Sequence, residues 1–198
     1  MCGIVGIAGE AGAADERALG RALAALRHRG PDGEGRWVSE DRRCALGHVR
    51  LALVDRAGGA QPIASEDGAV VAAVSGEFYG HAALRAELEA AGHRFRTRSD
   101  SEVLVHLYEE RGPAAIEALR GEFALLLWDG RERLLLAARD RFGVRPLCYA
   151  RLGDAWIFAS EAKALLAAGV PAAWDEEALL QAAQMHYHDG DRTLFRGI

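Results

Sequence analysis

The sequence predicts an α+β fold in which layers of strands and helices pack on one another. Apolar runs of strand length occur in groups, and segments with helical spacing flank them. Half of the 198 residues are hydrophobic, which is enough for a sizeable core. No internal repeat or low-complexity segment interrupts this pattern.

In the first half of the chain, strands and helices alternate. Residues 2–9 are apolar on both faces and predict a buried strand. Asp15 is placed to cap the helix that follows this strand. The predicted elements are strands at residues 2–9, 34–39, 43–54 and 69–74, and helices at residues 15–27 and 82–91.

In the second half, strands dominate. Ser99-Asp100-Ser101-Glu102 matches a capping box and opens a helix that continues through Tyr108. A hairpin is predicted from two apolar runs, residues 123–128 and 134–138, whose lack of polar alternation indicates that both faces are covered. The remaining predictions are helices at 114–119, 161–168 and 175–185, and strands near 147–151 and 155–159.

Composition excludes several functional classes. The net charge of −5 offers no basic stripe for nucleic acid, and the apolar runs are too short to span a membrane. The N-terminus lacks the basic start and long apolar region of a signal peptide. Cys2, Cys44 and Cys148 are odd in number and lack the spacing of a metal site, which favours a reduced, cytoplasmic compartment.

Cys2 is a candidate nucleophile because of its position. Once Met1 is removed, which a small second residue permits, the thiol shares a residue with a free α-amine. An α-amine has an unperturbed pKa of about 7.7–8.0, so it can accept the thiol proton near neutral pH. Taken alone, Cys2 could equally be a small hydrophobic residue at the start of a core strand.

Several short motifs resemble those of one protein family. In chain order they are Met1-Cys2-Gly3-Ile4-x-Gly6, Arg27-His28-Arg29-Gly30-Pro31-Asp32, Ser75-Gly76-Glu77-x-Tyr79-x-His81, Ser99-Asp100-x-Glu102 and Arg139-Asp140-x-x-Gly143-x-x-Pro146-Leu147. Each is weakly specific alone, but together they cover nearly the whole chain in the right order. The sequence therefore resembles the glutaminase domain of class II glutamine amidotransferases of the asparagine-synthetase type.

The resemblance implies the N-terminal-nucleophile hydrolase fold, a four-layer αββα sandwich of two antiparallel sheets. It implies a glutaminase domain over residues 1–185 and, at residues 186–198, the start of a linker to a synthetase domain. That second domain is not expected within these residues, because they contain no Ser-Gly-Gly-x-Asp-Ser pyrophosphate loop.

The implied reaction is hydrolysis of glutamine to glutamate and ammonia. The ammonia passes to an ATP-dependent amide synthetase domain, in cis or in trans, whose acceptor is aspartate or another carboxylate. ATP and Mg are expected in that synthetase domain, and no cofactor or metal is expected in this one. No nucleic-acid or membrane partner is predicted, and a homodimer is left open.

The resemblance also implies roles for individual residues. Cys2 is the nucleophile, Gly76 presents its N–H to the oxyanion, and Glu77 lies along the bound glutamine. Arg50 pairs with the substrate α-carboxylate and Asp100 with its α-ammonium group. Backbone contacts are expected from Leu51, Ala52, Leu53 and Val54. Read singly, Arg50 could be a surface arginine, Asp100 a helix cap and Gly76 a turn residue.

The remaining polar candidates are interpreted as structural. His28, His48 and His81 are not needed as bases, since the N-terminal amine fills that role. The Arg29-Gly30-Pro31-Asp32 segment is expected to shape a loop over the site. Cys44 and Cys148 are expected to be inert core thiols.

One position departs from the family pattern. Members usually carry Asn where this chain has Ser75, and that side chain supplies a donor to the oxyanion hole. Loss of such a donor typically costs about 10²–10³ in rate. The sequence therefore predicts a slowed glutaminase, unless the Ser75 hydroxyl or a water compensates. The alternative is a weak or inactive scaffold domain, against which the presence of Cys2, Arg50 and Asp100 argues.

Overall fold

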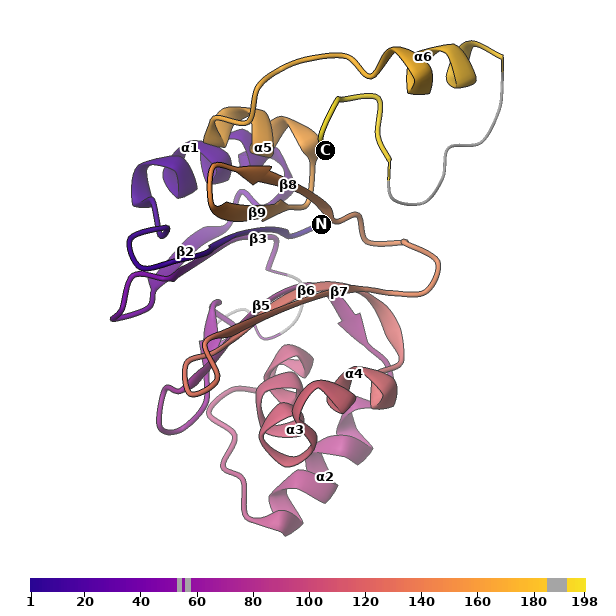
Figure 1. The fold of residues 1–198 in the computed structure, drawn as a ribbon. Helices are drawn as coiled ribbons and strands as arrows, with labels where there is room; N and C mark the ends of the chain where they lie inside the picture. Colours follow the sequence, from indigo (N-terminus) through magenta and orange to yellow (C-terminus); the bar gives the residue numbers. More distant parts are fainter. Residues whose placement is uncertain (53–54, 56–57, 185–191) are drawn as a thin grey trace.

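Two antiparallel sheets pack face to face between two layers of helices in the computed structural model (Figure 1), which describes the chain except residues 53–54, 56–57 and 185–191. The first sheet has the strand order β2-β3-β1-β9-β8 and the second β4-β5-β6-β7. The first sheet comprises β1 (Gly3–Ala8), β2 (Gly33–Val38), β3 (Cys44–Arg50), β8 (Cys148–Leu152) and β9 (Ala155–Ala159). The second comprises β4 (Ile63–Ala64), β5 (Val70–Phe78), β6 (Gly121–Asp129) and β7 (Leu134–Arg139).

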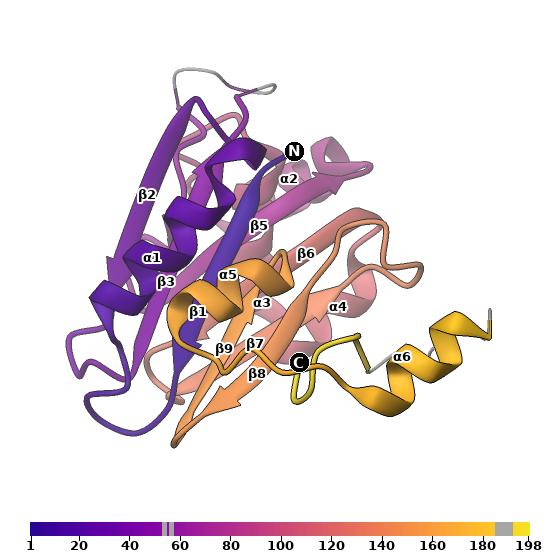
Figure 2. The same cartoon turned by 90° about the horizontal axis from the view of Figure 1, so that it is seen from above.

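The helices divide between the two outer faces. Helices α1 (Glu16–Leu26) and α5 (Ala162–Ala168) cover the first sheet, as Figure 2 shows from above. Helices α2 (His81–Ala91), α3 (Val103–Arg111) and α4 (Ala115–Ala118) cover the second. Short 3-10 turns precede or follow three of them: η1 (Arg27–Arg29), η2 (Asp100–Glu102) and η3 (Gly112–Ala114). Helix α6 (Glu176–Ala183) lies away from both sheets (Figures 1 and 2).

Strand β1 is the central strand of the first sheet, and this explains its composition. It pairs antiparallel with β3 on one side and with β9 on the other. Val5 and Ile7 pack toward α1 and α5, whereas Ile4 packs into the core between the two sheets. Both faces of the strand are therefore buried, as its apolar sequence predicts. Cys2 immediately precedes this fixed element.

The predicted α+β fold with two antiparallel sheets is confirmed, with local differences. Strand β5 continues to Phe78, beyond the predicted end at residue 74. Strand β3 ends at Arg50, whereas a strand over 43–54 was expected; residues 53 and 54 lie outside the described part. The short strand β4 was not predicted.

The prediction of full coverage for the hairpin holds for one strand only. Strand β6 is buried from Phe123 to Asp129, but β7 is half-buried along most of its length. The difference follows from position, because β6 is internal and β7 is an edge strand of its sheet. An apolar run alone cannot distinguish these two environments.

The capping box is also realised differently from the expected pattern. Ser99 caps the turn by accepting from the Ser101 N–H. The Glu102 carboxylate accepts instead from the backbone N–H groups of Arg96 and Thr97, each at 2.7 Å. Glu102 thus anchors the loop that precedes the helix, and it does not bond to the cap residue Ser99 as a capping box would require.

The end of the chain folds back toward the domain. Residues 192–198 are described, and the Phe195 ring stacks on Trp174 with ring centroids 5.0 Å apart. The side chain of Ile198 joins the core beneath α5. The predicted domain boundary at residue 185 lies outside the described residues and stays a prediction. Within the described part, no helix has the length and apolarity needed to cross a bilayer.

Candidate active site

The backbone of Cys2 is held by two donors from different parts of the fold. Its carbonyl oxygen accepts from Arg29 Nε at 2.9 Å and from the Ser75 hydroxyl at 2.8 Å. Two residues further along, Ile4 N–H donates to Ser160 Oγ at 2.9 Å. The first residues are therefore fixed by η1, β5 and the end of β9, whereas most chain ends are loosely held.

Arg29 is itself anchored by a charged cluster. Its Nη1 lies 2.8 Å from Glu161, which also contacts His28 and Lys163. Burial opposes ionisation of Glu161, but hydrogen bonds from Arg29, Lys163 and His28 outweigh it and lower the pKa of this carboxyl to about 2. Glu161 is therefore charged near neutral pH. The structure places His28 in this supporting cluster, in line with its structural interpretation.

The Cys2 thiol lies against the chain that leaves β3. Leu51 N–H points at Sγ with a distance of 3.4 Å, and Sγ lies 3.7 Å from the Leu51 carbonyl oxygen. A backbone N–H directed at sulfur stabilises negative charge on a thiolate. Leu51 therefore contacts the candidate nucleophile, and its predicted contact with glutamine stays a prediction.

A cavity of about 280 Å³ opens beside this thiol. This volume is near the lower limit of known ligand pockets, about 300–1,000 Å³, and suits a small ligand. The lining includes five predicted site residues besides Leu51: Cys2, Arg50, Gly76, Glu77 and Asp100. A larger cavity of about 580 Å³, between β7 and the strands β8 and β9, contains none of them.

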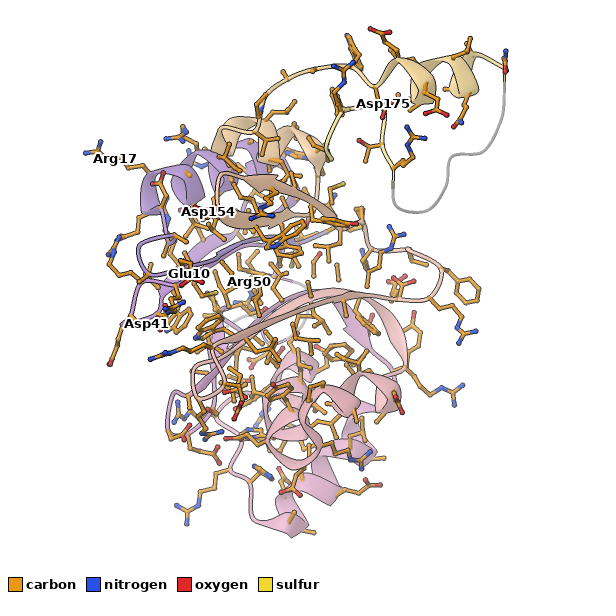
Figure 3. The ribbon with its side chains drawn as sticks, viewed as in Figure 1. Glu10, Arg17, Asp41, Arg50, Asp154 and Asp175 are labelled. Carbon is orange, nitrogen blue, oxygen red and sulfur yellow. The ribbon has the colours of Figure 1, made fainter. Side chains whose placement is uncertain are left out.

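Arg50 and Asp100 bring opposite charges to the cavity. Arg50 ends β3, lies between the two sheets in Figure 3, and donates from Nη2 to the Asp55 carbonyl oxygen. Asp100 begins η2, is 5% exposed, and accepts from the Phe78 N–H at 2.7 Å. One wall carries a guanidinium and another a carboxylate, which complements a zwitterionic amino acid.

Gly76 is required by its surroundings. It has φ of +151°, and a Cβ built there would lie 2.1 Å from the Glu122 carbonyl oxygen of the neighbouring strand. No other residue fits this close approach of β5 and β6. Gly76, which has no side chain, therefore presents only backbone to the cavity, and the exposed Glu77 lines the cavity beside it.

Ser75 differs from its expected placement. Its side chain is 1% exposed, and its hydroxyl donates to the Cys2 carbonyl. Ser75 does not line the cavity described above. The Ser75 hydroxyl therefore holds the backbone of the nucleophile and does not take the place of the Asn amide as an oxyanion donor.

One further predicted residue, Ala52, is not among the residues that line the cavity. Ala52 N–H donates to Asp32 Oδ2 at 2.9 Å, so this amide supports the loop before β2 rather than a ligand. Leu53 and Val54 lie outside the described residues. The Asp32 contact agrees with the expectation that the segment from Arg29 to Asp32 shapes a loop near the site.

Sequence reasoning missed several residues that line the cavity: His48, Gln61, Ser101 and Arg145. Gln61 forms two hydrogen bonds to Val74 of β5, donating at 3.1 Å and accepting at 2.6 Å. Arg145 pairs with Glu122, yet its buried Nε has no hydrogen-bond partner. His48 could have been found, because it precedes Arg50 by two residues and thus shares its face of the strand.

His48 is buried beside the cavity as a neutral imidazole. Burial, and to a smaller extent the charge of Arg50, lowers the pKa of His48 to about 4, although a contact with the Val74 carbonyl opposes the shift. Its Nε2 has no hydrogen-bond partner. A neutral ring beside Arg50 leaves the positive charge of this wall on the guanidinium alone.

This burial predicts a pH dependence of stability. Unfolded histidine has a pKa of about 6.5, so on acidification the unfolded chain takes up a proton that folded His48 does not. We expect His48 to lower the free energy of unfolding by about 1.5–2 kcal/mol between pH 6.5 and pH 5. Glu161 titrates below this window.

Denaturant unfolding at several pH values checks this, with His48→Gln as the comparison. The variant should lose less stability on acidification than the parent chain by that amount, whatever its absolute stability. Equal slopes for the two proteins would show that His48 does not titrate abnormally.

The chain is similar to known proteins in both sequence and structure. A family profile described as "Glutamine amidotransferase domain" matches residues 1–198. The chain is 44% identical over 169 residues to "Asparagine synthetase [glutamine-hydrolyzing] 3" of Arabidopsis thaliana, which covers 83% of this chain and 28% of that protein. It is 38% identical over 198 residues to "Asparagine synthetase [glutamine-hydrolyzing] 1" of Bacillus subtilis, covering 98% and 31%.

Other similar proteins extend this set. "Amidase chry2" of Gibberella zeae is 38% identical over 181 residues, covering 91% of this chain and 26% of that protein. Among solved structures, glutamine phosphoribosylpyrophosphate amidotransferase from B. subtilis, in complex with ADP and GMP, has a TM-score of 0.71 at 28% identity. That alignment covers 85% of this chain and 44% of the other. The chain spans between 26% and 31% of the length of these curated relatives.

Proposed function

Because the chain belongs to the glutamine amidotransferase domain family, we propose that its 280 Å³ cavity binds glutamine and that Cys2 cleaves the side-chain amide. The observation that carries this proposal is the meeting of Cys2, Arg50 and Asp100 around one cavity. The guanidinium of Arg50 pairs with the α-carboxylate, and the Asp100 carboxylate with the α-ammonium group. These two contacts leave the amide directed toward the thiol.

The reaction follows from the groups around Cys2. Once Met1 is removed, the α-amine of Cys2 takes the thiol proton, and Sγ attacks the amide carbon to form a tetrahedral oxyanion. The amine then gives its proton to the departing nitrogen, which leaves as ammonia, and a glutamyl thioester remains. Water attacks that thioester, releasing glutamate and restoring the thiol. Gly76 N–H serves as a donor to the oxyanion in both steps.

The fate of the ammonia is proposed from the relatives. Their names describe glutamine-hydrolysing asparagine synthetases and an amidase, and all are much longer than this chain. We propose that ammonia passes to an ATP-dependent, Mg-requiring synthetase domain, in cis or in trans, which amidates a carboxylate. Aspartate is the favoured acceptor, because two of these relatives are named asparagine synthetases. Another carboxylate is the alternative acceptor, because one relative is named an amidase.

Glutamate release from glutamine tests the proposal. The chain is expressed alone and joined to its synthetase partner, and glutamate is measured at saturating glutamine. We expect release that is slow from the chain alone and faster with the partner. Cys2 that fails to react with a glutamine-like electrophile in a folded chain would instead support the scaffold alternative.

A second prediction concerns the serine that replaces the expected asparagine. We expect Ser75→Asn to raise the rate of glutamate release, by up to about 10²-fold, because an amide there adds a donor to the oxyanion hole. Steady-state kinetics of the variant and the parent chain measure this. An equal or lower rate would show that the oxyanion is already satisfied without this side chain.

Ser75→Ala is the matched control. It removes the hydrogen bond to the Cys2 carbonyl but adds no donor, and Arg29 still reaches that carbonyl. Its free energy of unfolding should fall by about 0.5–1.5 kcal/mol, with no gain in rate.

A further inference from the structure

We propose that the protein binds a divalent transition metal ion of the zinc type in its outer helical layer, at Glu66, His93, His106 and Glu109. Each of these residues offers one ligand atom, and the four atoms lie within 4.8 Å of one another. None of the four residues lines the cavity beside Cys2. The proposed site is therefore separate from the glutaminase chemistry.

Three segments converge to form this cluster. Glu66 lies in the turn between β4 and β5, and His93 lies just after α2. His106 and Glu109 both belong to α3 and, three residues apart, share one face of that helix. A metal ion at this point would connect the outer helices to the edge of the second sheet.

Three of the six separations between the ligand atoms match those of a four-coordinate metal site. His106 Nδ1 lies 3.3 Å from Glu109 Oε2 and 3.5 Å from Glu66 Oε2. His93 Nδ1 lies 3.6 Å from Glu109 Oε2. Zinc bonds to nitrogen and oxygen are about 2.0–2.2 Å long, so a regular tetrahedron has edges of about 3.3–3.6 Å. The three distances fall within this range.

The residues that contact the proposed ligand side chains also fit a metal site. His93 Nε2 lies 2.9 Å from Glu110 Oε1, and this contact directs the N–H to Nε2 and a lone pair to Nδ1. Metal-bound histidines usually have such a carboxylate partner. Arg94 N–H donates to Glu66 Oε1 at 3.0 Å, which leaves Oε2 facing the cluster. His106 is held by the Phe95 ring, with centroids 4.5 Å apart.

Burial and charge also bear on the site. The His106 side chain is 2% exposed, which anchors the cluster to the protein interior. Two carboxylate and two imidazole side chains so close together form a donor set suited to a divalent transition metal ion, which would also offset the carboxylate charge. One neighbouring cation, Arg131 Nη2, lies 4.0 Å from Glu109 Oε1 and is also paired with Asp67. The competing explanation of the cluster is hydrogen bonding among these side chains without a metal, as between His106 Nδ1 and Glu109 Oε2.

Metal titration of the whole chain distinguishes these two cases. The chain is prepared as Cys2→Ala, so that the N-terminal thiol cannot bind metal, and is stripped with a chelator. We expect one Zn²⁺ per chain by elemental analysis, a higher melting temperature with Zn²⁺ but not with Mg²⁺, and a visible absorption of four-coordinate intensity with Co²⁺. A folded chain that takes up no stoichiometric Zn²⁺ would overturn the proposal in favour of a metal-free, hydrogen-bonded cluster.

Variants locate the site. His106→Ala should weaken Zn²⁺ binding by more than about 100-fold, and Glu110→Gln, which alters only the support of His93, by about 10- to 100-fold. Because His106 is buried, His93→Gln and Glu109→Gln serve as ligand variants if circular dichroism shows that His106→Ala is unfolded. His28→Ala, in the Glu161 cluster, should bind as the parent does. Unchanged affinity in folded His93→Gln would also overturn the proposal.

Discussion

Replacing Cys2 with alanine is expected to lower glutamate release from glutamine by at least about 10⁴-fold, as removal of a catalytic nucleophile does in other enzymes. The cavity lining, the Arg50 guanidinium and the Asp100 carboxylate all remain in this variant. Glutamine should therefore still bind, and the loss should fall on kcat. Glutamate release under saturating glutamine, together with binding by calorimetry, measures both effects.

Cys148→Ala is the matched control for this prediction. Its thiol is half-buried beside the larger cavity rather than beside Arg50, and burial raises its pKa. A raised pKa makes a thiol a poorer nucleophile near neutral pH. The variant should retain the parent's rate. A large loss of activity in Cys148→Ala, or residual turnover in Cys2→Ala, would remove Cys2 from the role assigned to it.

The second large effect is expected at Asp100. Asp100→Asn keeps an oxygen that can accept from the Phe78 N–H but removes the charge that would face the substrate ammonium. Loss of one partner from a buried charged pair costs about 2–5 kcal/mol, which corresponds to a fall in kcat/KM of roughly 30- to 4,000-fold. We expect most of this fall in KM, because the contact is made to the unreactive end of glutamine.

A substrate analogue makes this prediction specific. Glutamine without its α-amino group cannot form the ammonium contact, so the parent chain and Asp100→Asn should hydrolyse it at similar rates. If the variant loses as much activity toward this analogue as toward glutamine, Asp100 acts through the fold and not through the substrate.

Much of the fold was predictable because its signals are local. The apolar run from Ile4 to Ile7 required a strand buried on both faces, and β1 is the central strand of its sheet. Asp15 caps α1 as expected, accepting from Arg17 and Ala18. By contrast, the difference between β6 and β7 depends on which strand lies at the sheet edge. Neither apolar run determines the position of its strand in the sheet.

The candidate site was likewise predictable where its signals are local and unpredictable where they depend on contacts distant in sequence. Cys2, Gly76 and Asp100 belong to recognisable motifs, Arg50 was assigned from the family resemblance, and the fold brings all four to one cavity. The orientation of the Ser75 hydroxyl depends on a carbonyl distant in sequence, so the residue type could not reveal it. The proposed metal ligands come from three separate segments with no motif spacing, which explains why the sequence predicted no metal in this domain.

Mass spectrometry after reaction with the diazoketone analogue of glutamine is the sharpest test of Cys2 as the nucleophile, because it requires a single turnover. We expect a chain without Met1 that carries one adduct on Cys2. Excess glutamine should prevent the adduct, and Asp100→Asn should slow its formation. An unmodified Cys2 in a folded chain without Met1, or an adduct on Cys148 in its place, would show that Cys2 is not the nucleophile.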